Sequence, residues 1–135
     1  MMLCNQQLTE SQWHDFVKLS ELCEAKDGGL PALYGHLLRQ KRDSKSNLLY
    51  YEKGVLVGFL AGYFFYEDGC EISLMVAPSY RKKGIAAQLL STLLPLLISK
   101  GTRQVIFSLS GAFRLHWLTD TLNTIWNVIA LIKRC

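Results

Sequence analysis

The spacing of apolar residues changes along the chain, and the changes mark where helices give way to strands. From Thr9, a typical N-cap residue, apolar side chains recur at helical spacing until Gly28. Pro31 begins a second segment with helical spacing, "PALYGHLLRQKR", which ends in basic and polar residues. The pattern therefore predicts a short strand at 2–7 followed by two helices.

The middle of the chain is rich in β-branched and aromatic residues and is divided by turn pairs at 53–54 and 68–69. It predicts three antiparallel strands joined by hairpins, at about 47–52, 55–66 and 70–76. Because successive side chains of a strand point to opposite faces, the last strand has two different faces. One carries Cys70, Ile72, Leu74 and Val76, and the other carries Glu71, Ser73 and Met75.

Helical spacing returns at Gly84 in "GIAAQLLSTLLPLLISKG", which Gly101 closes. Pro95 is expected to kink this helix or to end its first part. The following "TRQVIFSLS" predicts another strand, which would lie parallel beside the strand at 70–76. The chain up to Ser110 is thus predicted as α/β with a mixed sheet.

Composition narrows the class of protein. The chain has 135 residues, of which 50% are apolar and 19% charged, as expected for one globular domain over 1–135 rather than a disordered chain. A net charge of +4 fits a small anionic ligand better than a nucleic-acid surface. We therefore expect no nucleic-acid partner. No signal peptide or membrane span is indicated, so we expect no membrane partner.

The four cysteines are scattered without a C-x-x-C pair, which argues against a zinc site or a disulfide framework. Reduced thiols and a cytoplasmic location are the simpler interpretation. Cys70 could be read as a nucleophile, but it lies on the face that also carries Ile72 and Leu74, and no histidine is close to it in sequence. A buried structural cysteine is the favoured interpretation of Cys70.

The segment 74–90, "LMVAPSYRKKGIAAQLL", combines a strand, three successive cations, a glycine and a helix. The first turn of a helix presents N–H groups without intrahelical partners, together with a partial positive charge, so it can bind phosphate. Gly84 and Ala86 would let an anion approach the backbone, and Arg81, Lys82 and Lys83 would add positive charge around it. A pyrophosphate fits such a loop, although a merely solvated basic loop is the alternative.

The segment 71–90, "EISLMVAPSYRKKGIAAQLL", closely resembles the acetyl-CoA-binding motif of the GNAT N-acetyltransferase superfamily. The signature of that motif is Gln/Arg-x-x-Gly-x-Gly/Ala, and Arg81, Gly84 and Ala86 occupy its defined positions. The predicted order of elements resembles the GNAT fold over residues 1–110. The resemblance implies a GNAT-like α/β (α+β) fold, whose mixed, mostly antiparallel sheet has a central parallel strand pair and is flanked by helices.

The resemblance also implies roles for individual residues. Backbone groups of the strand would pair with the pantetheine arm of acetyl-CoA, and backbone N–H groups of the loop would hold the pyrophosphate. The amine would attack the thioester directly, without a metal, and Glu71 is the candidate base that removes its proton through a water. The pantetheine set is Leu74, Met75 and Val76, and the pyrophosphate set is Arg81, Lys82, Lys83, Gly84, Ile85 and Ala86.

Both catalytic and acceptor assignments have structural alternatives. Glu71 could be an ordinary strand carboxylate that faces solvent or pairs with a lysine. Tyr63, Tyr66 and Glu67 could line an acceptor pocket or serve only in packing. Asp27 could attract a cationic amine, although helix ends favour such residues anyway.

The chain departs from the family pattern after residue 110. Relatives have a helix there with a tyrosine that protonates the leaving thiolate, whereas no tyrosine follows Tyr80 in this chain. Ser108 and Ser110 could replace a polar cofactor contact. The tail, 111–135, fits either a helix or a strand, and exposed apolar surface in either case favours a homodimer.

Two functions remain open. The first is an N-acetyltransferase that transfers the acetyl group of acetyl-CoA to a primary amine of a small molecule or peptide. The second is a GNAT-like domain with weak or absent activity that binds CoA or a protein partner.

Overall fold

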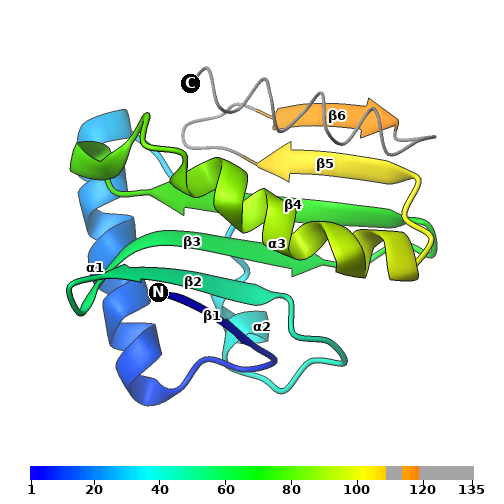
Figure 1. Ribbon diagram of the computed structural model, residues 1–135, viewed down its shortest axis with the longest axis horizontal. Coiled ribbons are helices and arrows are strands. Elements are labelled where there is room, and N and C mark those ends of the chain that lie inside the picture. Colours follow the sequence, from blue (N-terminus) through cyan, green and yellow to red (C-terminus); the bar gives the residue numbers. More distant parts are fainter. Residues whose placement is uncertain (109–113, 119–135) are drawn as a thin grey trace.

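The computed structural model of the chain describes residues 1–108 and 114–118. It contains a six-stranded sheet in the order β1-β2-β3-β4-β5-β6 (Figure 1). Neighbouring strands are antiparallel except β4 and β5, which are parallel, so the expected mixed sheet with one parallel pair is confirmed. The strands are β1 (Met2–Asn5), β2 (Asn47–Glu52), β3 (Val55–Tyr63), β4 (Gly69–Val76), β5 (Gln104–Ser108) and β6 (Arg114–Leu118).

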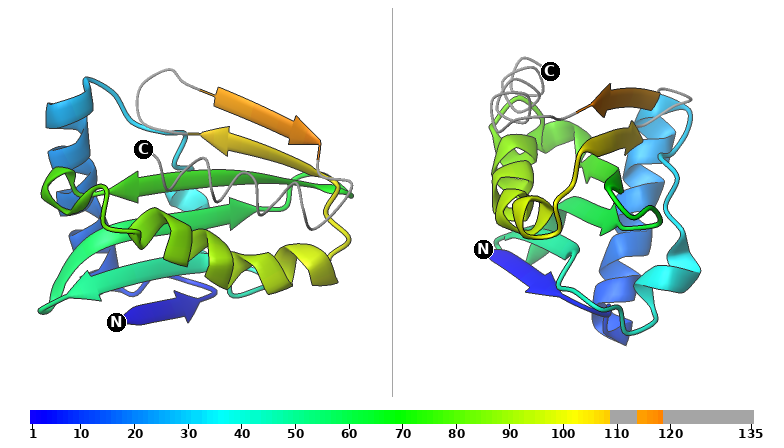
Figure 2. Two further views of the ribbon diagram at one scale, coloured as in Figure 1. Left: turned by 45° about the horizontal axis from the view of Figure 1, so that its top comes forward. Right: turned by 90° about the vertical axis from the view of Figure 1, so that its right-hand side faces the viewer.

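Helices cover both faces of the sheet. α1 (Glu10–Asp27) lies on one face and α3 (Ile85–Ser99) on the other, as the right panel of Figure 2 shows. The Phe16 ring of α1 packs edge-on against Phe59 of β3, with centroids 4.9 Å apart. On the opposite face, a Cβ added at Gly58 would lie 2.7 Å from Cγ2 of Ile85, so α3 sits directly on the β3 backbone.

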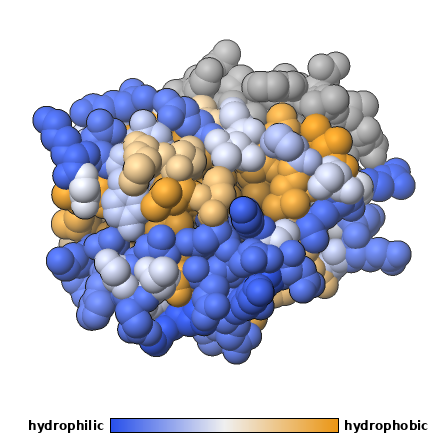
Figure 3. Space-filling view, turned by 60° about the horizontal axis from the view of Figure 1, so that its bottom comes forward, coloured by the Kyte–Doolittle hydropathy of each residue, from blue (hydrophilic) through white to orange (hydrophobic). Residues whose placement is uncertain are grey.

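Apolar burial accounts for this arrangement. Leucine, phenylalanine, cysteine and isoleucine side chains from α1, α3 and the central strands form one continuous buried core. One side of the molecule has hydrophilic side chains over most of its lower half, and its apolar side chains gather in the upper half (Figure 3). Among the described residues, no helix combines the length and apolar character needed to cross a membrane.

The first helix forms as its sequence predicts. The Thr9 side chain accepts the N–H of Gln12, and the Gln12 side chain accepts the N–H of Thr9, which together make a capping box. At the other end, Gly28 adopts φ 75° and donates its N–H to the carbonyl of Glu24 at 2.8 Å. Both ends of α1 are therefore set by local sequence.

The second predicted helix is largely wrong, because only α2 (Gly35–Leu38) is helical. In the preceding segment, the N–H and the carbonyl of Ala32 bond to side chains of the sheet, so they are not available to a helix. Tyr34 takes a left-handed conformation, with φ 48°. Tertiary contacts thus override the local helical spacing after Pro31.

In the third helix, Pro95 does not end the helix, which was one of the two effects expected of it. α3 runs without a break from Ile85 to Ser99 and includes Pro95. Pro95 and Ser91 are both exposed, so the Ser91 carbonyl, which loses its intrahelical partner at Pro95, can be hydrated. The proline is tolerated because it lies on the solvent side of the helix.

Strand ends also differ in detail from the sequence prediction. β1 is shorter than the predicted 2–7, and β3 ends at Tyr63 rather than at residue 66, since Phe65 and Tyr66 are largely exposed. After residues 109–113 the chain returns as β6, antiparallel to β5, rather than as the helix that the family resemblance implied. The predictions for Ser110 and for residues 119–135 lie outside the described residues.

Candidate functional site

The loop between β4 and α3 ends in an uncapped helix N-terminus. It passes through a short 3-10 turn, η1 (Pro78–Tyr80), and then reaches Gly84, the N-cap of α3, at φ 84°. No side chain caps α3 and no acidic residue lies in its first turn, in contrast to the capping box of α1. The first N–H groups of α3 can therefore bond an external anion.

The space above this N-terminus is open. A Cβ built at Gly84 would meet no atom within 4 Å. A hollow of about 510 Å³ adjoins Gly84 and is lined further along by Met2 and by Ala87, Gln88, Ser91 and Thr92 of α3. Lys82 has φ 63°, so two residues of the loop, Lys82 and Gly84, take left-handed conformations. The residues present therefore fit a phosphate group.

Arg81 does not extend toward this open space. Its Nη1 and Nη2 atoms each donate to the carboxylate of Asp27, at 2.7 Å and 2.7 Å, and its Nε donates to the carbonyl of Val76 at 3.0 Å. The Asp27 hydrogen bonds raise the pKa of Arg81. The guanidinium thus fastens the end of α1 to the end of β4 and shapes the loop, while Lys82 and Lys83 keep exposed side chains.

β4 extends beyond the end of its parallel partner. Its pairing with β5 ends at Ser73 and Ser108. Among the described residues, no strand lies beside β4 on that side past Ser73, although β4 stays paired with β3 through Val76. Among the described residues, the β5 side of β4 from Leu74 to Val76 therefore has no strand paired with it, and we call this side the opening.

Register determines which backbone groups face this opening. Ala77 donates its N–H to the Val57 carbonyl at 2.7 Å, so these two residues form a hydrogen-bonded pair. Alternation along the ladder turns the peptide groups of Met75 toward β3 and those of Leu74 and Val76 away from it. The Val76 carbonyl already accepts bonds from Arg81 and from Cys23, which leaves its N–H for an extended ligand.

The segment between α1 and α2 crosses the last pair of the parallel strands. Ser108 Oγ accepts the N–H of Ala32 at 2.8 Å, and Ser73 Oγ donates to the Ala32 carbonyl. Both serines are buried, and they lie opposite each other in register. The Tyr63 hydroxyl donates a hydrogen bond to the carbonyl of Leu33, the residue that follows Ala32. Ala32 thus bridges β4 and β5 at the closed end of the opening.

Glu71 is buried in the sheet rather than exposed to solvent. Only 3% of its surface is accessible, and in register it lies opposite Tyr63 on β3. The Tyr63 ring contacts Tyr34 and Phe65, with centroids 4.8 Å and 5.5 Å away. Burial is the main cause that raises the pKa of Tyr63, and the nearby charge of Glu71 raises it further. Glu71 therefore lies in the interior beside the phenol of Tyr63, which stays uncharged at neutral pH.

The other residues considered in sequence lie outside this arrangement or are inert. Burial raises the pKa of the Cys70 thiol to about 12, so it is almost entirely protonated at neutral pH and a poor nucleophile. Tyr66 and Glu67 are exposed in the turn after β3. Of the proposed acceptor residues, only Tyr63 lies next to Glu71.

The contact of Asp27 with Arg81 and the contacts of Ser73 and Ser108 with Ala32 were not assigned from the sequence. A serine on a buried strand between apolar residues is one available signal, because a buried hydroxyl needs a partner. The identity of that partner, a backbone group of Ala32, has no such signal. Sequence reasoning therefore found the loop but not the contacts that fix it.

Comparison with protein families gives one match. The model of the acetyltransferase (GNAT) family matches residues 5–116. A search of curated proteins found no match.

Solved structures share the fold at low sequence identity. Ard1 from Thermoplasma volcanium aligns with a TM-score of 0.56 and 17% identity, over 79% of this chain and 69% of its own. N-acetylglutamate synthase from Neisseria gonorrhoeae, complexed with coenzyme A and N-acetyl-glutamate, has a TM-score of 0.55 and 20% identity, over 79% of this chain and 25% of its own. Diaminobutyrate acetyltransferase EctA from Paenibacillus lautus, in complex with its substrate and coenzyme A, has a TM-score of 0.57 and 18% identity, over 79% and 64%.

Proposed function

This chain belongs to the GNAT acetyltransferase family, and we propose that it transfers the acetyl group of acetyl-CoA directly to a primary amine of a small molecule or peptide. The uncapped N-terminus of α3 behind Gly84 carries the proposal, because it offers N–H groups and open space to a pyrophosphate. Two solved structures with the same fold hold coenzyme A, which supports acetyl-CoA as the donor.

In this proposal, the loop residues act mainly through their backbone. N–H groups between Arg81 and Ala86 bind the pyrophosphate, and the exposed side chains of Lys82 and Lys83 add positive charge. Arg81 holds the loop in place through Asp27.

The pantetheine arm would extend the sheet along the free side of β4. Of the strand residues expected to bind it, Leu74 and Val76 turn peptide groups toward the opening, whereas Met75 contributes through packing. The Val76 N–H is the donor that we assign to the arm.

We assign the general base to Glu71. Its carboxylate takes a proton from the amine through a water, the amine nitrogen attacks the thioester carbonyl, and the carbon–sulfur bond breaks to release the thiolate of CoA. The position of Glu71 beside Tyr63, on the strand whose free side is assigned to the pantetheine arm, supports this role.

The acceptor, location and assembly complete the proposal. The diaminobutyrate complex of EctA supports a small amine as acceptor. Free thiols at Cys4, Cys23 and Cys70 support a cytoplasmic location, where cysteines stay reduced. The homodimer stays a prediction, which light scattering of the purified protein would test.

The test is a calorimetric titration with acetyl-CoA, with dephospho-CoA and ATP as controls for partial ligands. Gly84→Glu is expected to abolish binding, because a carboxylate would occupy the phosphate position. Gly101→Glu is the matched control, since Gly101 also has a positive φ, 64°, and open space around it, but lies beyond the other end of α3. It should bind acetyl-CoA like the parent protein.

The outcomes separate the two open functions. Binding that is lost in Gly84→Glu and kept in Gly101→Glu, together with acetylation of an amine in a substrate screen, supports the transferase. Binding without transfer to any amine would leave a CoA-binding domain, and equal binding by both variants would refute the assignment of the loop.

A further inference from the structure

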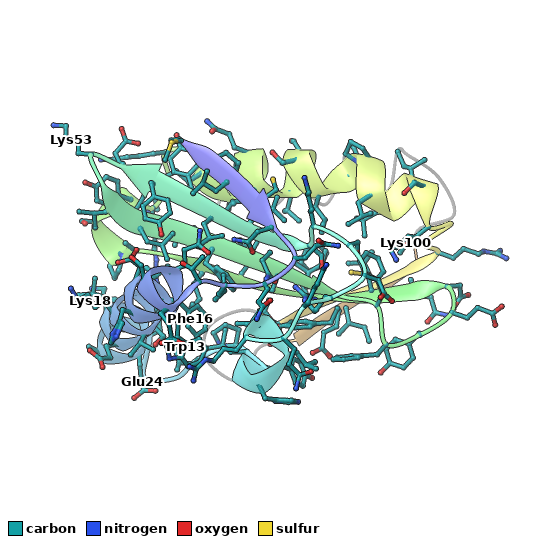
Figure 4. The ribbon with its side chains drawn as sticks, turned by 90° about the horizontal axis from the view of Figure 1, so that it is seen from below. Trp13, Phe16, Lys18, Glu24, Lys53 and Lys100 are labelled. Atoms are coloured by element: carbon teal, nitrogen blue, oxygen red, sulfur yellow. The ribbon has the colours of Figure 1, made fainter. Side chains whose placement is uncertain are left out.

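A second cavity lies far from the phosphate loop. Its volume is about 280 Å³, and it opens where β3 and α3 end. The 15 residues of α3 separate Gly84 from Lys100 by about 22 Å at 1.5 Å per residue. Figure 4 shows Lys100 and Lys53, in the β2–β3 turn, at opposite ends of the molecule. The cavity is lined by Leu37, Lys41, Arg42, Asp43, Ser44, Ser46, Tyr63, Phe64, Phe65 and Lys100.

The charge of this cavity is unbalanced. Lys41, Arg42 and Lys100 bring three cations to the lining and Asp43 brings one carboxylate. Among the residues that the structure describes, ion pairs form at Arg39 with Glu10 and at Arg81 with Asp27, and none of these three cations is in one. The lining therefore attracts an anion.

Arg42 is the cation with the strongest requirement for a partner. It is partly buried, and burial lowers its pKa. Its Nη1 donates to the Gly62 carbonyl at 2.7 Å and its Nη2 donates to Asn47 Oδ1, while Nε is buried and bonds no acceptor in the described part of the chain. A guanidinium has five N–H donors, so donors remain for a ligand. Because burying a charge without an opposite charge is costly, a bound anion would stabilise this site.

Aromatic rings form the apolar part of the lining. The Arg42 guanidinium lies over the Tyr63 ring at 4.9 Å, and the Lys100 ammonium lies over Phe64 at 4.5 Å. The Phe65 ring stacks on Tyr63 with an interplanar angle of 8°, yet Phe65 is 48% exposed. The rings thus present a flat apolar surface beside the cations, which suits a planar ligand.

We propose that this cavity binds a small aromatic anion, either a carboxylate or a phosphate monoester. The anionic group bonds Arg42 and Lys100, and the planar body packs against Phe65. The proposal does not depend on acetyl transfer, because none of the lining residues belongs to the phosphate loop.

The test is calorimetric titration of the full chain, without acetyl-CoA, with phenylacetate, phenyl phosphate and the neutral benzyl alcohol. An aromatic anion of this size is expected to bind with a dissociation constant below about 1 mM, and benzyl alcohol at least about tenfold more weakly. Tighter binding of phenylacetate or of phenyl phosphate identifies the anionic group. Absence of saturable binding by both anions, or equal binding of benzyl alcohol, would overturn the proposal.

Variants locate the binding. Lys100→Gln removes an exposed charge and should lower the affinity for the anion about fivefold. Arg42→Lys keeps the charge but loses the planar guanidinium, so it should lower the affinity more than about tenfold. Lys18 is an exposed residue of α1, so Lys18→Gln is the matched charge control and should bind the anion like the parent protein. Equal weakening in Lys18→Gln and Lys100→Gln would show a general charge effect and refute the site. Gly84→Glu should bind the anion like the parent protein. Loss of anion binding and loss of acetyl-CoA binding can therefore be told apart.

Discussion

Arg81 occupies the first position of the phosphate-binding motif, yet its side chain binds another part of the protein. Its two hydrogen bonds to Asp27 connect α1 to the loop that precedes α3. Paired guanidinium and carboxylate groups with parallel bonds are stronger and more directional than single contacts. The motif arginine thus supports the site by fixing the loop conformation.

Asp27→Asn tests this supporting role. Removing the carboxylate charge from a pair that is only 31% and 15% exposed should lower the free energy of unfolding by about 1–3 kcal/mol. It should also weaken acetyl-CoA binding severalfold, because the loop loses its anchor. Urea denaturation and calorimetry measure the two effects.

The control for Asp27→Asn is Glu10→Gln. Glu10 pairs with Arg39 on the surface, where the two side chains are 79% and 48% exposed, so the change in unfolding free energy should stay below about 1 kcal/mol. If Asp27→Asn bound acetyl-CoA as tightly as Glu10→Gln, Arg81 would have no role in shaping the loop.

Glu71→Gln tests the proposed base. The amide has nearly the same shape but cannot accept a proton, so turnover at saturating acetyl-CoA should fall about 10- to 100-fold. The loss should be greatest at low pH, where the amine is most protonated, and should shrink as pH rises. A pH–rate profile measures it, and Glu24→Gln, an exposed carboxylate of α1, is the control. A profile of unchanged shape and height would rule out Glu71.

At the scale of elements, the contact between α3 and β3 depends on two glycines that are not equivalent. A Cβ at Gly58 would lie 2.7 Å from Ile85 Cγ2, whereas a Cβ at Gly62 would lie 3.4 Å from its nearest neighbours, in ordinary contact. Ile85 is the first residue of α3, so the packing at Gly58 sets the position of the helix start. The position of the loop before α3 is therefore coupled to Gly58 of β3, which faces the first residue of the helix.

Gly58→Ala and Gly62→Ala make a matched pair. Gly58→Ala should lower the free energy of unfolding by about 1–3 kcal/mol through overpacking and should weaken acetyl-CoA binding by shifting α3. Gly62→Ala should leave the affinity for acetyl-CoA unchanged, and should leave the free energy of unfolding unchanged or raise it slightly. Thermal denaturation and calorimetry of the two variants test this, and equal behaviour would contradict the close packing at Ile85.

The sequence predicted those elements whose signals are local. The caps of α1, the turns between β2, β3 and β4, and the alternation along β4 all depend on residues close together in the chain. The second helix failed because Ala32 is held by serines on β4 and β5, and the partner of Arg81 is 54 positions away. Spacing along a chain contains no information about such distant partners.

At the scale of the whole molecule, the sheet has the proposed phosphate-binding loop at one end and a basic, aromatic cavity at the other. The described pairing of β4 with β5 ends at Ser73 and Ser108, before β4 reaches the loop, and α3 spans the distance between the two ends. Because no residue of the loop at 81–86 lines the cavity, the loop and the cavity can each be disrupted separately by mutation.

Ala32 connects β4 to β5 through two serine hydroxyls at their last pair. Any ligand that spreads the two strands must lengthen one of these bonds, and the amide hydrogen of Ala32 is the group released first on the β5 side. Its exchange with deuterated solvent therefore reports how often the strands separate. The exchange rate of one amide hydrogen thus reports changes in the spacing of β4 and β5 at their last pair.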